Sequence, residues 1–527
     1  MDFSDGSVTV VRPRAAVDFT QALLAFRDAN QSSSLVDDWK GPSEQWRGLK
    51  TEEGELTELM LDGCGLSQVP PQVAGLAKLQ KLWLSNNGLR QLPDEIGDLA
   101  QLQSLWLGNN LLRNLPEGIS RLGKLEQLWM PNNNFREFPT VVCKLPSIEW
   151  LDMSENKLTS IPPCIGGMTT LGRLDLHSNS IATLPDEIGQ LKQVKHLSLH
   201  FNALASLPSG IAGCEGLVWL SLNANRLTAL PGEVCGMTAL VRLSLHINQL
   251  ASLPENIGAL TELEALSLHK NRLARLPSSI GRLAGVSRMS LYENSLVEVP
   301  PEVGGMANLQ ELWLYSNQLT ALPRQLGQLQ RLRKLWADRN QLSSVPDELG
   351  DCAELQELYL DQNQLKTLPL SLAGLANLRR LYLEGNPDLV IPQELRDLPA
   401  LDFRDYQAAA AAAAGRTAAG GTAAGNTTGG STAPGGTAAA GAGPAAAAAP
   451  HAADSAAEVP PMPQDALVGG MGGLSLTGAT GAGAGGGSGE TAWGGAAGSR
   501  KSPAADGASR HAFLLDPMRL VEQQDNY

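Results

Sequence analysis

One asparagine recurs every 23 residues through most of the chain. Starting at Asn87, the same residue type occupies 14 consecutive positions, and one further step toward the N-terminus reaches Cys64. These positions are Asn87, Asn110, Asn133, Asn156, Asn179, Asn202, Asn225, Asn248, Asn271, Asn294, Asn317, Asn340, Asn363 and Asn386. Since a unit this short cannot bury its own apolar edge, the 15 repeats must stack on one another in an elongated array.

Each repeat has the pattern of a strand followed by a tight turn. Counted from the asparagine, apolar residues lie at −8, −5 and −3, as in Leu217, Leu220 and Leu222 before Asn225. The alternation at −5 and −3 is strand periodicity. We expect the asparagine to bond backbone groups where the chain leaves the strand. The second half, as in LPDEIGQLKQ, favours a short helix or 3₁₀ turn on the opposite side.

This pattern resembles the leucine-rich repeat, L-x-x-L-x-L-x-x-N/C-x-L. The resemblance implies an α/β repeat solenoid, a horseshoe of 15 repeats with a parallel concave sheet and short helical or 3₁₀ convex segments. The 23-residue form LPxxIGxLxxLxxLxLxxN is similar to the Ras-group family, which includes plant intracellular Ras-group-related proteins, over residues 56–400. That family implies non-enzymatic scaffolding in intracellular signalling, sometimes joining a small GTPase to a phosphatase.

The two ends differ from the repeats. Residues 17–55 resemble the N-terminal helical cap of plant-type leucine-rich repeat proteins, with Trp39 and Trp46 matching its tryptophans but without its paired cysteines. That absence favours a reducing compartment. Leu398, Phe403 and Tyr406 are expected to cover the last repeat.

Five regions follow from these composition changes. We predict a disordered N-terminus (1–16), the cap (17–55), the leucine-rich repeat domain (56–406), a disordered Ala/Gly/Ser/Thr-rich tail (407–510) and a short C-terminal helical peptide (511–527). The last segment has a helix-start signal at Asp516-Pro517, and it is either a docking peptide or a frayed terminus.

The six cysteines occupy structural positions of the repeat, so most are expected to be buried and reduced. Their positions are Cys64 at the asparagine, Cys214 and Cys352 at +12, Cys143 and Cys235 at +10, and Cys164 at +8. No Cys-x-x-Cys or Cys/His spacing predicts a zinc site.

Composition excludes several classes of protein. The formal net charge of −14 argues against nucleic acid as a partner, because phosphate binding needs an excess of Lys and Arg. The N-terminus has no secretory signal pattern, and no uninterrupted run of 18 apolar residues predicts a membrane span. We therefore expect a cytoplasmic protein.

Outward positions of successive repeats form rows, because the register never changes. Seven of the 10 tryptophans and five of the 7 histidines fall on the predicted concave face, in the rows at −6, −4 and −2. The predicted partner-binding residues are Trp83, Trp106, Trp129, Trp150, His177, His200, Trp219, His246, His269, Tyr292, Trp313, Tyr315, Trp336, Tyr359 and Tyr382.

Two interpretations of these rows compete. Duplicated repeats inherit their residues, and neighbouring rings stacked as a ladder would stabilise the sheet by roughly 0.2–1 kcal/mol per pair without any partner. Alternatively, a solvent-facing aromatic stripe marks an interface, where Trp, Tyr and Arg dominate the binding energy. The near-absence of aromatics from the convex positions favours binding.

The histidines suggest three kinds of chemistry. His177/His200 and His246/His269 should lie about 5 Å apart across parallel strands, but nothing enforces the geometry of a metal site. Ser198-x-His200 and its counterparts pair a nucleophile with a base, yet no oxyanion hole or orienting acid is implied, so we predict no catalysis. A third hypothesis is partner binding that weakens below about pH 6.5 as imidazoles become charged.

The sequence therefore predicts an intracellular protein–protein interaction scaffold in signalling that binds a protein partner on the concave aromatic face. By family resemblance the partner is a small GTPase or a phosphatase. No cofactor, metal, nucleic acid or membrane span is expected, and no enzyme signature is present. The alternative is a structural component of a large cytoskeletal or ciliary (axonemal) assembly.

Overall fold

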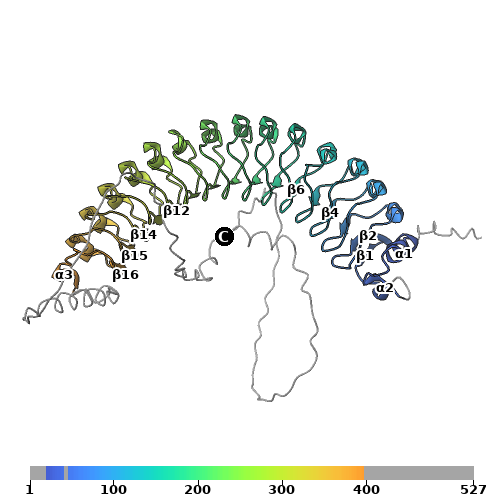
Figure 1. The fold of residues 1–527 in the computed structure, drawn as a ribbon, viewed down its shortest axis with the longest axis horizontal. Helices are drawn as coiled ribbons and strands as arrows, with labels where there is room; N and C mark the ends of the chain where they lie inside the picture. Colours follow the sequence, from blue (N-terminus) through green and yellow to red (C-terminus); the bar gives the residue numbers. More distant parts are fainter. Residues whose placement is uncertain (1–18, 41–45, 397–527) are drawn as a thin grey trace, which may run out of the picture. The chain divides into compact units, whose positions relative to one another are not determined.

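The computed structural model describes residues 19–40 and 46–396. Its centre is one 16-stranded sheet in which every strand pairs with its neighbours in sequence. Figure 1 shows the strands along the inner, concave edge of the repeat array and the 3₁₀ turns along its outer edge. The predicted leucine-rich repeat horseshoe is confirmed.

Each repeat contributes one parallel strand at a fixed place. These strands are β2 (Glu55–Met60), β3 (Lys81–Trp83), β4 (Ser104–Trp106), β5 (Gln127–Trp129), β6 (Trp150–Asp152), β7 (Arg173–Asp175), β8 (His196–Ser198), β9 (Trp219–Ser221), β10 (Arg242–Ser244), β11 (Ala265–Ser267), β12 (Arg288–Ser290), β13 (Glu311–Trp313), β14 (Lys334–Trp336), β15 (Glu357–Tyr359) and β16 (Arg380–Tyr382). They pair in register, so equivalent positions of neighbouring repeats lie side by side, as Trp83 does beside Trp106.

The convex side consists of one 3₁₀ turn in each repeat but the last, where helix α3 (Gln393–Arg396) takes its place. The turns are η2 (Pro71–Gly75), η3 (Asp94–Asp98), η4 (Glu117–Arg121), η5 (Thr140–Lys144), η6 (Pro163–Gly167), η7 (Asp186–Gln190), η8 (Ser209–Gly213), η9 (Gly232–Gly236), η10 (Ile257–Ala259), η11 (Ser278–Arg282), η12 (Pro301–Gly305), η13 (Arg324–Gln328), η14 (Asp347–Asp351) and η15 (Leu370–Gly374). Successive turns pack closely at position +10. A Cβ added to Gly97 would clash with the carbonyl oxygen of Gly118, which explains the small residue there.

The core lies between the strands and the turns. Leu217, Leu220 and Leu222, at −8, −5 and −3 of one repeat, are fully buried, and their equivalents repeat this burial along the array. Each fully buried leucine contributes roughly 1.5–3 kcal/mol, and a single repeat supplies only one wall of the space around it. Burial of the leucines that recur every 23 residues therefore requires that neighbouring repeats stack on one another.

The asparagines form the predicted bonds to the backbone. Asn225 Nδ2 donates to the carbonyl oxygens of Leu199 (2.9 Å) and Leu222 (3.0 Å), and its Oδ1 accepts from the Leu204 N–H (3.0 Å). Two of these bonds reach the preceding repeat, so each asparagine joins two units. At the one exception, Cys64 Sγ lies 3.7 Å from the Asp62 carbonyl oxygen, a weaker contact.

The residue before each asparagine lies in the left-handed backbone region. Asn86 has a φ of 58° and Ile247 a φ of 54°. Asparagine adopts this conformation readily, whereas for an ordinary L residue it costs roughly 1–2 kcal/mol, and a β-branched residue there is an outlier. The conformation belongs to the fold, but the choice of residue varies along the array.

The N-terminal end combines helices with an extra strand. Helix α1 (Thr20–Ala29) and helix α2 (Leu35–Asp38) precede β1 (Leu49–Glu52), which pairs antiparallel with β2 and was not predicted. The buried Trp39 and Trp46 rings stack at 5.1 Å, and Trp39 Nε1 donates to the Arg47 carbonyl oxygen at 3.0 Å. No helix within the described ranges is both long and apolar enough to cross a membrane.

Two of the cysteines are bonded to each other. Cys143 in η5 and Cys164 in η6 form a disulfide with their Cα atoms 5.9 Å apart, so the prediction of reduced thiols is wrong for this pair. The reason is the packing of the turns: a +10 side chain points at position +8 of the next repeat, as the Gly97–Gly118 approach shows. Cys214 and Cys352 are buried free thiols, as predicted.

The C-terminal end of the described array is helix α3 (Gln393–Arg396). Several sequence predictions lie outside the described residues. They are the disordered N-terminus (1–16), the covering residues Leu398, Phe403 and Tyr406, the disordered tail (407–510) and the helical peptide (511–527).

Candidate binding face on the concave sheet

Three tryptophans form a ring stack at the N-terminal part of the concave face. The ring centroids of Trp83 and Trp106 are 4.4 Å apart with planes 2° from parallel, and those of Trp106 and Trp129 are 4.6 Å apart at 14°. All three side chains are half-buried. The rings therefore cover much of one another and offer their edges, rather than their faces, to solvent.

A charged cluster ends this stack. Trp150 meets Trp129 edge to face at 4.9 Å, and the Arg173 guanidinium carbon lies 4.5 Å from the Trp150 ring centroid. Asp175 is buried and accepts from both: Arg173 Nε at 2.7 Å and Trp150 Nε1 at 3.2 Å. The guanidinium is thus held by a ring and a carboxylate together.

Asp152 lies beside Asp175 in strand register. Its Oδ1 accepts from the backbone N–H and the hydroxyl of Ser154, at 2.9 and 2.7 Å. Burial and the neighbouring Asp175 carboxylate raise the pKa of Asp152 well above its usual range. The charged cluster therefore includes a carboxyl group that holds its proton more strongly than a free aspartic acid.

A second set of rings lies in the C-terminal repeats. Trp313 and Trp336 stack at 5.4 Å, Trp336 and Tyr359 are tilted at 5.1 Å, and Tyr359 and Tyr382 stack at 4.3 Å. Among the described residues, the buried indole nitrogens of Trp106, Trp313 and Trp336 have no hydrogen-bond partner. Buried polar groups without a partner are uncommon in native proteins.

The histidines lie in stacks one row further along the strands. His177 stacks on His200 at 4.4 Å, and His246 stacks on His269 at 4.3 Å, which confirms the predicted proximity. The second stack continues through Tyr292 (4.2 Å) and Tyr315 (4.3 Å).

The hypothesis of a switch near pH 6.5 disagrees with this geometry. Burial lowers the pKa of His200 and His246 to about 4 and that of His269 to about 3, and it also lowers the pKa of His177. These imidazoles therefore remain neutral at pH 6.5, and the face does not gain charge there.

Serine hydroxyls approach some of the imidazoles. Ser198 Oγ lies 3.0 Å from His200 Nδ1, and Ser221 Oγ lies 3.3 Å from the same nitrogen. Ser290 Oγ lies 2.8 Å from His269 Nδ1. These contacts fix ring orientation along the array. No cluster of three or more metal-ligating side chains exists within the described residues.

The remaining predicted residue, Trp219, lies edge to face with His196 at 5.7 Å. The structure thus brings all fifteen predicted residues onto one sheet face, with indole stacks in the N-terminal repeats, histidine and tyrosine stacks in the central ones, and tryptophan and tyrosine stacks in the C-terminal ones. The exposed Phe201 and Ile247 were not among the predicted residues; they lie at position −1, next to the histidine row at −2. The sequence could have indicated them, because both are large apolar residues in a row that is otherwise rich in polar ones.

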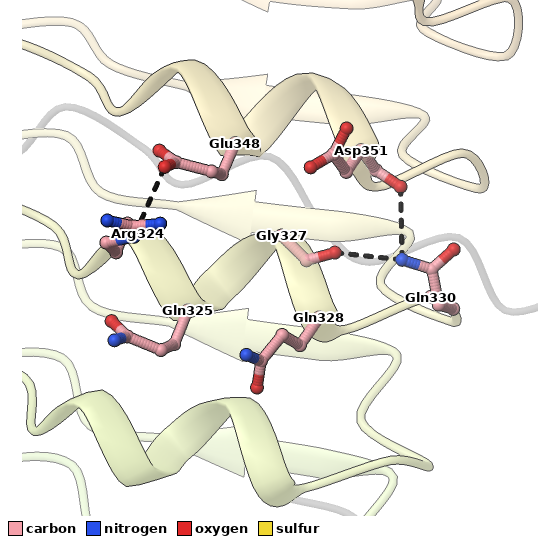
Figure 2. A pocket seen from close by; sticks show the side chains of 7 residues that line it. All are labelled: Arg324, Gln325, Gly327, Gln328, Gln330, Glu348 and Asp351. Atoms are coloured by element: carbon pink, nitrogen blue, oxygen red, sulfur yellow. Dashed lines mark hydrogen bonds and ion pairs between the residues drawn. The ribbon is translucent and has the colours of Figure 1, made fainter.

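The convex side also has open grooves. Figure 2 shows one of about 540 Å³ between η13 and η14, where Arg324 Nε lies 3.2 Å from Glu348 Oε1. Gln330 Nε2 donates to the carbonyl oxygens of Gly327 (2.8 Å) and Asp351 (3.2 Å). Several polar groups of this groove, those of Arg324, Glu348 and Gln330, already bond within it, which makes it a weaker candidate than the concave face.

Comparison with known proteins agrees with this architecture. The family described as "Leucine rich repeat" matches residues 54–112, 146–204, 169–227 and 338–387, and the one described as "Leucine-rich repeat region" matches residues 243–343. No curated protein matches the chain.

Solved structures include clear relatives. A leucine-rich repeat protein of Leptospira interrogans is 35% identical, with a TM-score of 0.57, over 66% of this chain and 84% of that one. The plant peptide hormone receptor RGFR1, solved in complex with RGF2, is 29% identical with a TM-score of 0.56, over 63% of this chain and 56% of that one. InlJ of Listeria monocytogenes, 21% identical with a TM-score of 0.54, shares the fold over 68% of this chain and 74% of its own. With its register, its asparagine ladder and the Leptospira relative, this chain belongs to the leucine-rich repeat family.

Proposed function

We propose that this protein is an intracellular signalling scaffold that binds a protein partner on its concave face. The observation that carries this proposal is the continuous sheet face on which fifteen parallel strands align rings, hydroxyls and charges in register. Leucine-rich repeat domains generally mediate protein–protein interaction rather than catalysis, and RGFR1 was solved with a peptide partner.

The ring stacks support binding in a specific way. Stacked rings have fixed orientations, so a partner that contacts their edges loses little conformational entropy from this side. The unpartnered indole N–H groups of Trp106, Trp313 and Trp336 are donors that a partner could satisfy after small side-chain movements. Ring stacking and partner binding are therefore compatible, because stacking fixes the ring orientations that a partner would contact.

The class of partner and the compartment rest on the resemblance to the Ras-group family, which points to a small GTPase or a phosphatase inside the cell. The Cys143–Cys164 disulfide favours an oxidising compartment instead, because such bonds are rare in the cytosol. Mass spectrometry of thiols alkylated at the moment of lysis would separate these two: a reduced pair supports the cytoplasm, and an oxidised pair contradicts it.

The binding proposal is tested by affinity capture with two sets of variants. The concave set is Trp83→Ala, Trp106→Ala and Trp129→Ala combined, and the matched convex set is Arg324→Ser with Glu348→Ser. We expect the concave variant to lose the partners that wild type recovers, and the convex variant to keep them. Both must show the wild-type circular dichroism spectrum.

Equal recovery by all three proteins would contradict the proposal. A captured small GTPase or phosphatase would support the proposed partner class. Retention of the wild-type protein in a detergent-insoluble, high-salt pellet would favour a cytoskeletal or ciliary assembly instead.

A further inference from the structure

Two arginines at the centre of the concave face have no carboxylate. The other basic residues in the row at −6 each form an ion pair: Lys81 with Glu58, Arg173 with Asp175, Lys334 with Glu311, and Arg380 with Glu357. Arg242 and Arg288 are exposed and form no ion pair with any residue in the described part of the chain.

The surroundings of these arginines leave the charges open. Arg242 and Arg288 both lie in register with Ala265, whose small side chain separates them. Glu311, in register with Arg288, has its carboxylate 3.1 Å from Lys334 Nζ. Two parallel-strand spacings place the two arginine Cα atoms roughly 10 Å apart. Both guanidinium groups can therefore reach one anionic group above Ala265.

Unused hydroxyls lie next to the arginines. Ser244 and Ser267, half-buried at position −4, make no side-chain hydrogen bond with a described residue, unlike Ser198, Ser221 and Ser290. Beyond them in the strand direction, the buried His246 Nδ1 is also without a partner in the described ranges. The centre thus offers polar groups that no described residue satisfies, and each serine hydroxyl among them can donate a hydrogen bond to a carboxylate.

An apolar edge borders the same repeats. Phe201 is 56% exposed and Ile247 is 43% exposed, with Ala224 between them in the row at −1. In three N-terminal repeats this left-handed position holds asparagine, which suits it, whereas isoleucine there is an outlier. Such outliers concentrate at functional sites, and this one exposes an apolar side chain.

We propose that repeats 201–290 bind an extended segment of a protein partner that has carboxylates along one side and apolar side chains along the other. The carboxylates meet Arg242 and Arg288, and the apolar side chains meet Phe201 and Ile247. Ile247 follows Arg242 by five positions, which sets the two contact lines at most roughly 16 Å apart. This inference rests on the proposed concave binding face and names the chemistry of what it binds.

Charge complementarity favours an acidic partner at the arginine pair over the C-terminal repeats. Those repeats place Asp338, Asp361 and Glu384 in the row at −2. An acidic segment is therefore repelled there and attracted at the arginine pair. Its binding should weaken as salt rises, because exposed charges are screened.

The test uses blocked synthetic peptides and the full-length protein. The probes are fluorescent peptides of Glu-Leu repeats, whose extended form has carboxylates on one side and leucines on the other, with Lys-Leu and Glu-Ser repeats for comparison, measured by anisotropy at low salt. We expect only the Glu/Leu peptide to bind well. Arg242→Gln with Arg288→Gln should weaken it on the order of tenfold and flatten its salt dependence.

Matched variants separate this site from general charge effects. The double variant Arg226→Gln with Arg272→Gln removes the same charge from two exposed arginines that are also two repeats apart but lie at position +1. It should leave binding unchanged. Phe201→Ser with Ile247→Ser should weaken binding about threefold or more without altering the salt dependence. Leu111→Ser with Val297→Ser is the corresponding apolar control.

Several outcomes would overturn the inference. They are no binding of the Glu/Leu peptide to wild type, equal binding by the Arg242/Arg288 and Arg226/Arg272 variants, or displacement by inorganic phosphate rather than by the unlabelled Glu/Leu peptide. If captured partners depend on Trp83, Trp106 and Trp129 but not on the arginines, the inference fails while the concave binding function stands.

Discussion

The N-terminal and central repeats share one backbone but differ in how their outward side chains are satisfied. Around β3–β7 the rings of Trp83, Trp106 and Trp129 cover one another, and Arg173 has both a ring and a carboxylate. Around β10–β12 the guanidinium groups of Arg242 and Arg288 form no ion pair with another described residue. The same strand register can therefore present either side chains that contact and neutralise one another or side chains left open to a partner.

The two regions should also respond to pH in opposite directions. In the centre, His200, His246 and His269 have folded pKa values of about 3–4, below the roughly 6.5 of an unfolded chain. Between pH 6.5 and 4 only the unfolded state takes up protons, so the stability of these repeats falls as pH falls.

This acid sensitivity is the largest expected effect. We expect a loss of about 2 kcal/mol per histidine at pH 4, measured as the opening free energy of β8–β12 amides by hydrogen exchange. The triple variant His200→Gln, His246→Gln, His269→Gln should show a flatter pH dependence in that region. The same slope in wild type and variant would show that the imidazoles titrate normally.

A second prediction concerns the ring stack itself. Trp106→Ala removes the middle ring and should destabilise the exchange-protected amides of β3–β5 by about 3 kcal/mol, since two stacked pairs and much apolar burial are lost. The matched change in the centre, Ser267→Ala, should cost less than about 0.5 kcal/mol. Similar costs at both sites would break the comparison between a ladder and an open surface.

The smallest effect is expected at the junction of the stack with its charged cluster. Burial and the Asp175 carboxylate raise the folded pKa of Asp152 above the roughly 3.9 of an unfolded aspartate, so the unfolded state releases its proton first as pH rises. The stability contributed there is complete below about pH 4 and is lost as pH rises through the folded pKa.

Asp152→Asn removes this loss while keeping an acceptor for the Ser154 hydroxyl. We expect the variant to exceed wild type in stability by about 2 kcal/mol above pH 7 and to approach it near pH 4, by urea denaturation. Asp388→Asn, on the surface outside the cluster, is the control. A variant that is less stable than wild type at pH 8 would show that Asp152 is charged and stabilising.

Much of this fold followed from one recurring asparagine. The constant 23-residue step places every strand, turn and outward row, because each element must recur with that period. The stacking of His177 on His200 was predictable for the same reason. By contrast, β1 escaped prediction because it lies outside the repeat and pairs antiparallel with β2.

The repeat pattern could not predict which side chains of different elements contact one another. The Cys143–Cys164 bond depends on position +10 pointing at +8 of the next turn, which only the packing distances reveal. The low pKa values of the histidines depend on burial by neighbouring rings. The open charges of Arg242 and Arg288 became evident only after the pairings of the other basic residues were known.

The most direct test of concave binding is site-specific photo-crosslinking with a benzophenone side chain. The probe replaces Ser267 on the concave face in one protein and the exposed Gln328 on the convex turn in another. The account predicts that the partner crosslinks from position 267 and not from position 328. Crosslinking from position 328 alone would contradict it and assign binding to the convex side.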